Sequence, residues 1–336
     1  MNGLHLTLLV LLMVLFAVLV PSPVLTGGVP GVSVYGICVA ISAAVAALLA
    51  AWLRRGDKPD TRRVPLGELL LCCTAGAFIG ARLLFCAIRF DMFLYWMGPA
   101  AIVTTWTGGF LLYGALLGAM LAAAMLAKRH RVSVASTLDE LAAPGLAAIA
   151  ISRLGEWTTG EGVGVWVESE AFMRLPFAVG NEYGEWQLAV FLWEAAAAFV
   201  ILLVVLWLRG RKRGEEQGEL FMSALVLYAC CQIVFESLRQ DGCLRIGFVR
   251  VSQVLSACAV MGVTLARALR RGEKKGAALH AVIILLCVGA VGGIEWALDK
   301  TVVSNRLLYA GMVLSSGVMA FTARRAGRGL GGERDR

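Results

Sequence analysis

Charged side chains stand at the ends of long apolar segments in this sequence, where they could do chemistry. Arg153 and Glu156 end one such segment, and Glu161 follows shortly afterwards. Glu236 and Arg239 end a second segment. A guanidinium group binds a phosphate or a carboxylate through paired hydrogen bonds, and a positioned carboxylate can take a proton from a nucleophile. These residue types favour a site for an oxyanion, such as the phosphate of a lipid headgroup.

A glycine-rich segment surrounds the first of these charged groups. Residues 152–164 read SRLGEWTTGEGVG, so that Gly155 and Gly160 lie among the charges. Backbone N–H groups in such a stretch can turn toward an oxyanion while Arg153 neutralises it. This combination, directly after an apolar run, predicts an anion or headgroup site.

Two further strings place polar groups among glycines. Residues 108–118 read GGFLLYGALLG, in which Tyr113 lies between Gly109 and Gly114. Such glycines let two backbones approach closely, or let the chain stay irregular where it lines a cavity. Arg82 lies in a GARL string inside another apolar run. Any one of these charged groups could form an ordinary ion pair, or could extend its charged end to the membrane–water interface. Together they lie at one depth of the predicted membrane, and such a set favours a functional cavity.

The elements that carry these residues are predicted to be membrane-spanning helices. Of the 336 residues, 59% are hydrophobic and only 16% are charged, whereas about a quarter of a soluble domain is charged. Apolar runs of roughly 17–25 residues indicate an all-α, polytopic integral membrane helical bundle of about ten transmembrane helices. The expected spans are 4–21, 33–53, 66–88, 108–127, 136–152, 187–208, 219–238, 248–266, 278–297 and 305–323.

The basic residues give these spans a direction. Lys and Arg cluster at five places, and every cluster follows an even-numbered span. The positive-inside rule therefore places all five clusters, and both chain termini, in the cytoplasm. The net charge of +8 is accordingly assigned to cytoplasmic loops and not to a nucleic-acid surface. The clusters lie at 54–63, 128–131, 209–213, 267–275 and 324–336.

In their order along the chain, these strings resemble those of the bacterial prolipoprotein diacylglyceryl transferases. Residues 152–164 are similar to the family signature G-R-x-G-N-F-x-N-G-E-x-x-G. They match it at Arg153, Gly155, Gly160, Glu161 and Gly164.

The other strings follow in the order that the family has them. Tyr35 and the glycine after it are similar to an early Tyr-Gly pair. Arg82 lies in a string similar to the family's G-x-R-L, and Tyr113 in one similar to G-G-x-x-x-H-G-G. Glu236 and Arg239 resemble the charged residues of an E-F-x-R-x-P-D string. The resemblance covers spans two to eight.

Two positions depart from the family pattern. Tyr113 stands where the family has His, and Glu156 stands where the signature has Asn. The chain has only three His, at positions 5, 130 and 280. The charge distribution places all three on the cytoplasmic side, so a histidine base is not expected at this site.

The resemblance implies a reaction and a division of the chain. The reaction moves the diacylglyceryl group of phosphatidylglycerol onto the lipobox Cys thiol of a prolipoprotein signal peptide, at the bacterial plasma (inner) membrane. Membrane lipids are the other expected partners, and neither a metal nor an organic cofactor is expected. Residues 1–30 would form an extra N-terminal transmembrane helix with a linker, and residues 31–268 a seven-helix family core. Residues 269–336 would add two transmembrane helices and a basic cytoplasmic tail.

The resemblance also implies roles for single residues. The expected catalytic residues are Tyr35, Tyr113, Glu161 and Arg239. The expected substrate-binding residues are Arg82, Gly109, Gly114, Arg153, Gly155, Glu156, Gly160 and Glu236. The group that takes the thiol proton is left open among Tyr113, the two glutamates of residues 152–164 and the lipid phosphate.

Two other functions compete with this interpretation. A degenerate relative could bind a lipid headgroup with the arginine pair and have lost transfer, which the tyrosine at position 113 favours. A small-solute transporter could line a pathway with the same polar residues. A transporter would need polar groups deep in several spans, whereas this chain concentrates them at one end.

The topology leads to a labelling test. Residues 153–186 lie on the side opposite the basic clusters, so they are expected outside the cytoplasm. A Ser169→Cys substitution, in a background without competing exposed thiols, should react with an impermeant thiol reagent added to intact cells. Labelling that occurs only after the cells are lysed would reverse the predicted orientation.

Overall fold

The computed structural model describes residues 7–8, 10–14, 33–56, 62–105, 108–181, 183–211, 216–241, 244–272, 274–300 and 304–327. Within those residues, nine helices are long and apolar enough to cross a membrane. They correspond to the second through tenth predicted spans, so the all-α class is confirmed. Most of the first predicted span lies outside the described residues.

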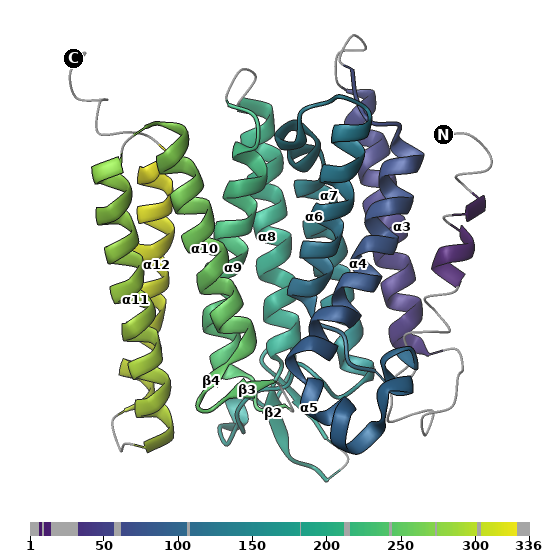
Figure 1. Ribbon diagram of the computed structural model, residues 1–336. Helices are drawn as coiled ribbons and strands as arrows, with labels where there is room; N and C mark the ends of the chain where they lie inside the picture. The colour runs from purple at the N-terminus through teal and green to yellow at the C-terminus, as the bar shows by residue number, and fades with distance from the viewer. Residues whose placement is uncertain are drawn as a thin grey trace. The chain divides into compact units, whose positions relative to one another are not determined.

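The nine long helices of the described residues follow one another along the chain, with longer connections between α4 and α6 and between α7 and α8 (Figure 1). Helix α9 has the limits that its apolar run predicts, and α7 ends three residues later than its run and so includes Arg153. The bounds are α3 Val34–Arg55, α4 Leu66–Ile88, α6 Leu112–Arg129, α7 Val134–Gly155, α8 Val190–Arg211, α9 Glu219–Leu238, α10 Val251–Arg270, α11 Lys274–Lys300 and α12 Asn305–Ala326.

The connections contain short elements that periodicity did not predict. Between α4 and α6 lie α5 (Phe90–Met92), a π-helix (Phe93–Met97) and a 3₁₀ turn (Pro99–Ile102). Two further 3₁₀ turns, Glu156–Thr158 and Glu170–Phe172, follow α7. Two antiparallel hairpins pair β1 (Ala178–Gly180) with β2 (Trp186–Leu188) and β3 (Arg245–Ile246) with β4 (Val249–Arg250).

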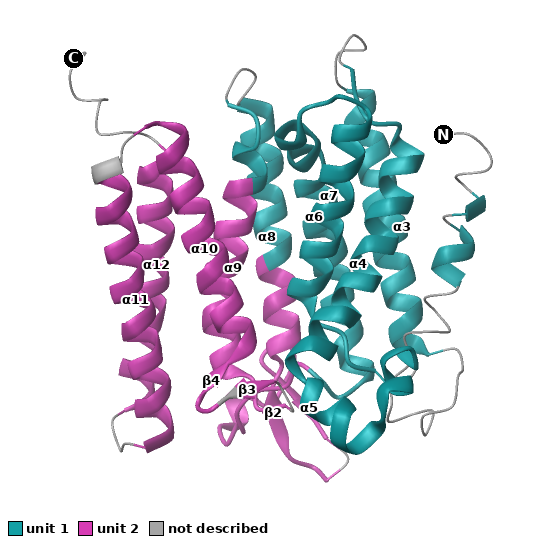
Figure 2. Ribbon diagram, in the orientation of Figure 1, with its two compact units in different colours: residues 1–161, 198–221 teal, residues 162–197, 222–336 magenta. Residues whose placement is uncertain are grey.

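The chain divides into two compact units (Figure 2). Unit 1 comprises residues 1–161 and 198–221, and unit 2 comprises residues 162–197 and 222–336. These units follow spatial contacts, whereas the division predicted from the sequence follows the family resemblance. That sequence-based division stays a prediction.

In unit 1, α4 packs along α6 and α3 packs along α7. The first pair meets through glycines. A Cβ atom added to Gly76 would lie 2.7 Å from the carbonyl oxygen of Gly118. Helices in lipid gain little by burying apolar surface, so close backbone approach at small residues is a main source of their attraction. The glycines of the 108–118 string therefore have a packing role where they face α4.

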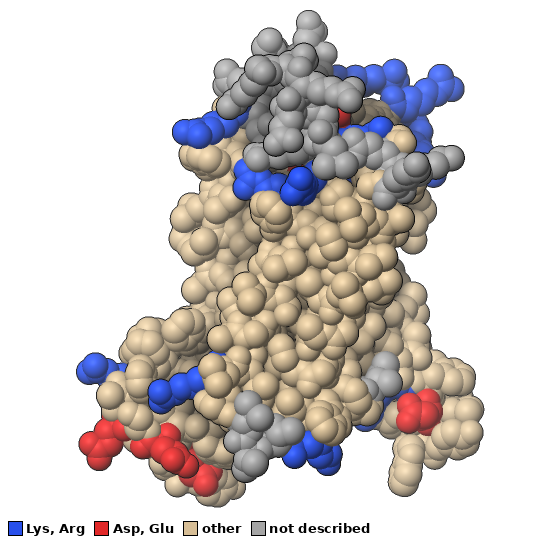
Figure 3. All heavy atoms as spheres, turned by 90° about the vertical axis from the view of Figure 1, so that its left-hand side faces the viewer, with Lys and Arg blue, Asp and Glu red and all other residues tan. Residues whose placement is uncertain are grey.

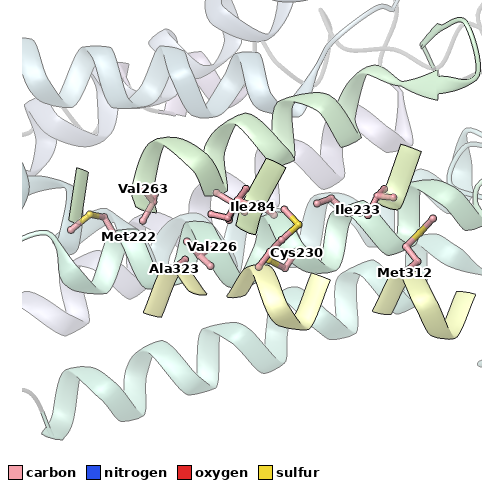
Figure 4. Packing of buried hydrophobic residues seen from close by; sticks show 12 residues of the cluster. Met222, Val226, Cys230, Ile233, Val263, Ile284, Met312 and Ala323 are labelled. Atoms are coloured by element: carbon pink, nitrogen blue, oxygen red, sulfur yellow. The ribbon is translucent and has the colours of Figure 1, made fainter. Parts of the chain in front are cut away.

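In unit 2, α9 to α12 share one apolar core (Figure 4). The outer face of unit 2 along α11 and α12 is apolar between the two ends of these helices (Figure 3). Large exposed side chains such as Leu286 and Leu314 lie on this face, as lipid contact requires. The buried core residues are Met222, Val226, Ala229, Cys230, Ile233, Val260, Val263, Ile284, Val291, Met312, Met319 and Ala323.

The glycine contact between α4 and α6 leads to a stability test. Gly118→Ala places a methyl group against the backbone of Gly76, so it should destabilise the fold by about 1–3 kcal/mol, the usual cost of overpacking. Gly145→Ala is the matched control, because an added Cβ there meets nothing within 4 Å and the lost glycine flexibility should be neutral or favourable. Thermal unfolding in detergent measures both. Equal midpoints for the two variants would contradict the packing role.

Candidate functional site

Arg239 is buried at the end of α9 and lies in a frame of carboxylates within unit 2. Its Nε and Nη2 donate to Asp241 Oδ2 at 3.1 and 2.5 Å, and its Nη1 lies 3.5 Å from Glu194 Oε2. The guanidinium is 8% exposed and Glu194 is 1% exposed. A charge in such a place must be paired and hydrogen-bonded. Asp241 and Glu194 therefore fix the orientation of the Arg239 side chain.

A glutamine connects the two buried glutamates of this frame. The Gln232 Nε2 donates to Glu194 Oε1 and to Glu236 Oε1, at 3.0 Å each. All three side chains are at least 95% buried. Gln232 and Glu236 are four residues apart on α9, which places both on the helix face toward α8. Three carboxylates and one arginine thus form a single hydrogen-bonded cluster with Gln232.

The glycine-rich stretch joins this cluster through its backbone. The N–H of Gly162 donates to Asp241 Oδ2 at 2.7 Å, and Gly164 forms an antiparallel bridge with Arg239. A Cβ atom on Gly164 would lie 2.7 Å from the carbonyl oxygen of Leu238, so glycine is required at this crossing. The end of the signature-like string therefore lies directly beside Arg239.

In unit 1, the end of α7 carries the other predicted arginine. Arg153 Nη1 forms an ion pair with Glu156 Oε1, and both side chains are buried. Gly155, between them, lies against α3, where an added Cβ would lie 3.2 Å from Tyr35 Cδ2. Ser33 caps α3 by accepting a hydrogen bond from the Gly36 N–H at 2.8 Å. The structure thus brings together Tyr35, Arg153, Gly155 and Glu156.

Arg82 donates hydrogen bonds to backbone carbonyl groups. Arginine has five N–H donors, and the Arg82 guanidinium makes five hydrogen bonds to carbonyl oxygens. It also lies within 6 Å of three phenylalanine rings. The acceptors are Ala101, Ile102, Thr104, Gly108 and Gly109. Arg82 therefore organises the irregular chain between α5 and α6, including Gly109, which has a φ of +84°.

Tyr113 begins α6 beside the same segment. Its side chain is 5% exposed. Gly114 lies against α4, because an added Cβ would come within 2.8 Å of Leu84 Cβ. The Leu111 N–H donates to the carbonyl oxygen of Ala81 at 3.2 Å. The start of α6 is thus fixed next to the turn of α4 that carries Arg82.

Glu161 differs from the other predicted carboxylates because its side chain is exposed. The glycines on either side, Gly160 and Gly162, have φ of +69° and +72°. This is a left-handed conformation that glycine adopts without strain. Glu161 therefore stands at a sharp turn of the chain.

Three residues of these clusters were absent from the predicted site. Glu194 and Asp241 are charged residues at the ends of apolar runs, as Glu236 is, but they were assigned no role in the predicted site. The sequence indicates Gln232 less clearly, because it is a single polar amide in an apolar run, one helical turn before Glu236.

A cavity lies at the end of α7 away from Arg153, within unit 1. It has a volume of about 170 Å³ and is lined by Arg63, Ser136, Asp139, Glu140 and Arg209. Asp139 accepts hydrogen bonds from the N–H groups of Gly218 and Phe221, so it caps the start of α9. Among the described residues, none that the sequence predicts for the site lines this cavity.

Comparison with known proteins relates the chain to a single family. A family model described as prolipoprotein diacylglyceryl transferase matches residues 24–268. The chain is similar to proteins named phosphatidylglycerol–prolipoprotein diacylglyceryl transferase. The relative from Listeria innocua is 31% identical over 231 residues, which is 66% of this chain and 79% of that protein. The one from Lactobacillus gasseri is 29% identical over 245 residues, which is 70% of this chain and 86% of that protein.

The carbonyl contacts of Arg82 lead to a test of its role. Lysine has three donors in place of five, so Arg82→Lys must leave carbonyl oxygens without their partner. Each buried group left unsatisfied costs about 1–3 kcal/mol. Limited proteolysis should therefore cut residues 89–111 faster in this variant. Arg89→Lys is the control, because Arg89 is exposed. Equal cleavage rates in both variants would show that Arg82 does not hold this segment.

Proposed function

The chain belongs to the prolipoprotein diacylglyceryl transferase family, and we propose that it transfers the diacylglyceryl group of phosphatidylglycerol to the lipobox Cys of a prolipoprotein signal peptide. In this reaction a carbon–sulfur bond forms to the cysteine. The bond between the glyceryl carbon and the phosphate oxygen breaks, and glycerol phosphate leaves with the electron pair. The observation that carries the proposal is the buried Arg239, whose orientation two carboxylates fix.

Arg239 is the residue that we expect to bind the phosphate as it becomes the leaving group. Negative charge grows on the phosphate while the carbon–oxygen bond breaks, and a donor held in place before the reaction stabilises that charge without reorganisation. Asp241 and Glu194 supply this preorganisation, and Gln232 and Glu236 support Glu194 in turn. The carboxylates also balance the charge of Arg239 and hold its side chain in place when no lipid is bound.

Arg153 has a similar environment in unit 1, because Glu156 pairs with it. We assign Arg153 to binding of the headgroup, together with the backbone of Gly155 and Gly160. Tyr35 lies beside Gly155 and has a hydroxyl that can donate to the phosphate or the glycerol.

The cysteine thiol must lose its proton, since the thiolate is the nucleophile. Glu156 already pairs with Arg153, whereas Glu161 is exposed at a glycine turn next to the string that reaches Arg239. We therefore propose that Glu161 takes the proton from the cysteine thiol. Tyr113 takes the position of the family's histidine, and its hydroxyl is assigned to hydrogen bonding with the substrate.

We propose an indirect effect on substrate binding for Arg82, Gly109 and Gly114, which position the chain around them. Arg82 donates to five backbone carbonyls, and Gly114 lets α6 lie against α4. These contacts support a role in shaping the segment that leads into Tyr113. Arg82 would thereby affect binding without touching the headgroup.

We further propose that the chain lies in the bacterial plasma membrane with both termini in the cytoplasm. The five basic clusters support this orientation through the positive-inside rule. The apolar surface of α11 and α12 supports contact with membrane lipid.

The alternative is a relative that binds the headgroup and has lost transfer. The observation that favours it is the replacement of the family's histidine by Tyr113. A protein of this kind would bind phosphatidylglycerol through the arginines and leave the cysteine unmodified.

Lysine substitutions test the phosphate-binding role. Lysine keeps the charge of Arg239 but lacks the planar fork that fits a phosphate. Arg239→Lys and Arg153→Lys should each lower the transfer rate by about two to three orders of magnitude, as loss of an oxyanion donor does. A diacylglyceryl transfer assay in membranes measures the rate, and the yield of detergent-solubilised protein verifies folding.

The control for these variants is Arg245→Lys, because Arg245 is exposed on β3, close in sequence to Arg239. Its rate should equal that of the wild type. If Arg153→Lys and Arg239→Lys also fold and transfer at the wild-type rate, neither arginine binds the phosphate as proposed.

A further inference from the structure

The two C-terminal helices contribute a buried carboxylate to the family core. Glu295, on α11, is 7% exposed and accepts a hydrogen bond from Gln253 Nε2 of α10 at 2.5 Å. The family match ends at residue 268, so Glu295 lies outside it and Gln253 lies inside it. Both residues belong to unit 2.

Gln253 also connects α10 to α9. Its Nε2 donates to the carbonyl oxygen of Ile233 at 3.2 Å, and its Oε1 accepts a hydrogen bond from the Arg250 N–H at 3.3 Å. The Arg250 Nη2 in turn lies 3.5 Å from the carbonyl oxygen of Ser237. One side chain therefore caps the start of α10 and contacts the last turns of α9.

Those last turns carry the proposed phosphate-binding cluster. Ile233 and Ser237 flank Glu236 on α9, and Arg239 follows directly after the helix. A shift of α9 relative to α10 would therefore move Glu236 and Arg239 together. Misplacing a catalytic group by about 1 Å can cost on the order of a hundredfold in rate.

The added helices are firmly docked, so Glu295 has a fixed position. At the other end of α10, the Arg267 Nη1 donates to the carbonyl oxygen of Ala323 on α12 at 3.1 Å, and its Nη2 donates to Ser223 Oγ on α9 at 2.9 Å. The apolar core of unit 2 lies between these two polar contacts. Apolar packing alone would hold such a helix pair, and a carboxylate within a span is costly unless it is engaged.

We propose that Glu295 is a positioning residue for the transferase site, which acts by holding Gln253 and, through it, the end of α9 that carries Glu236 and Arg239. The part of this inference that concerns transfer rests on the function proposed above. The added helices are accordingly a support for the site and not only a membrane anchor.

The test compares Glu295→Leu with Glu295→Gln in the full-length chain, using vesicles of phosphatidylglycerol and a lipobox peptide. Leucine removes the acceptor, so kcat should fall about tenfold with little change in the KM for the lipid, a typical coupling between contacting residues. Glutamine keeps an acceptor oxygen and should restore most of the rate. Glu295→Leu should have no further effect in a Gln253→Leu background. If the Leu variant does not accumulate, Glu295→Ala replaces it.

A second readout does not depend on transfer. Hydrogen exchange of residues 233–241 should be faster in Glu295→Leu than in the wild type, because the end of α9 loses its support. Ile284→Val is the control for packing loss alone. Ile284 is buried about three turns away from Glu295 on the same helix, so this variant should lower thermal stability without changing kcat or exchange at 233–241.

The outcomes separate the two proposals. A wild-type chain that transfers nothing would refute the proposed function, and the exchange comparison would still decide whether Glu295 supports α9. Exchange at 233–241 that is the same in Glu295→Leu and the wild type would overturn the positioning role. An active chain in which Glu295→Leu keeps the full kcat, or in which Glu295→Gln is as slow as Glu295→Leu, would overturn it as well.

Discussion

A guanidinium group keeps its charge when helices pack around it, because arginine does not lose its proton in proteins. Arg239 is such a group, and much of unit 2 is arranged to satisfy it. Asp241 lies two residues further on and binds it directly, Glu194 approaches from α8, and the backbone of Gly164 crosses beside it. The two carboxylates that pair with the charge come from two places in the chain, Asp241 directly after α9 and Glu194 in α8, so the charge requires these segments to meet.

The other predicted arginines are satisfied in different ways, and the difference bears on their roles. Arg153 pairs with Glu156, and we propose that part of this contact is exchanged for a phosphate. Arg82 donates to five carbonyls of one irregular segment, so its donors are used to shape that segment. The proposed roles of the same residue type therefore differ, with ligand binding at Arg153 and chain geometry at Arg82.

The sequence predicted the parts of the fold that depend on composition. A run of about 20 apolar residues has to form a helix in a membrane, because every backbone polar group must be satisfied internally, and α9 begins and ends where that rule places it. The two hairpins were missed because strands of two or three residues are too short to show alternation. Their turns depend on residues such as Gly247, whose φ is +64°.

The sequence likewise predicted only part of the candidate site. Arginines and glutamates at the ends of spans stand out against an apolar background, and family strings then select among them. Gln232 and Glu295 did not stand out, because a single polar residue in an apolar run is as compatible with helix packing as with function. Their partners lie 38 and 42 residues away in the sequence, and only the folded chain shows the contacts.

The central claim is that this chain modifies a cysteine with a lipid, although Tyr113 stands where its family has histidine. The most direct measurement is the intact mass of a lipobox peptide after incubation with the purified chain in vesicles of defined composition. With phosphatidylglycerol present, the peptide should gain one diacylglyceryl group on its cysteine, and a peptide with serine at that position should stay unmodified. An unmodified cysteine peptide, with folded protein that still binds phosphatidylglycerol vesicles, would contradict the account and identify a headgroup-binding relative that has lost transfer.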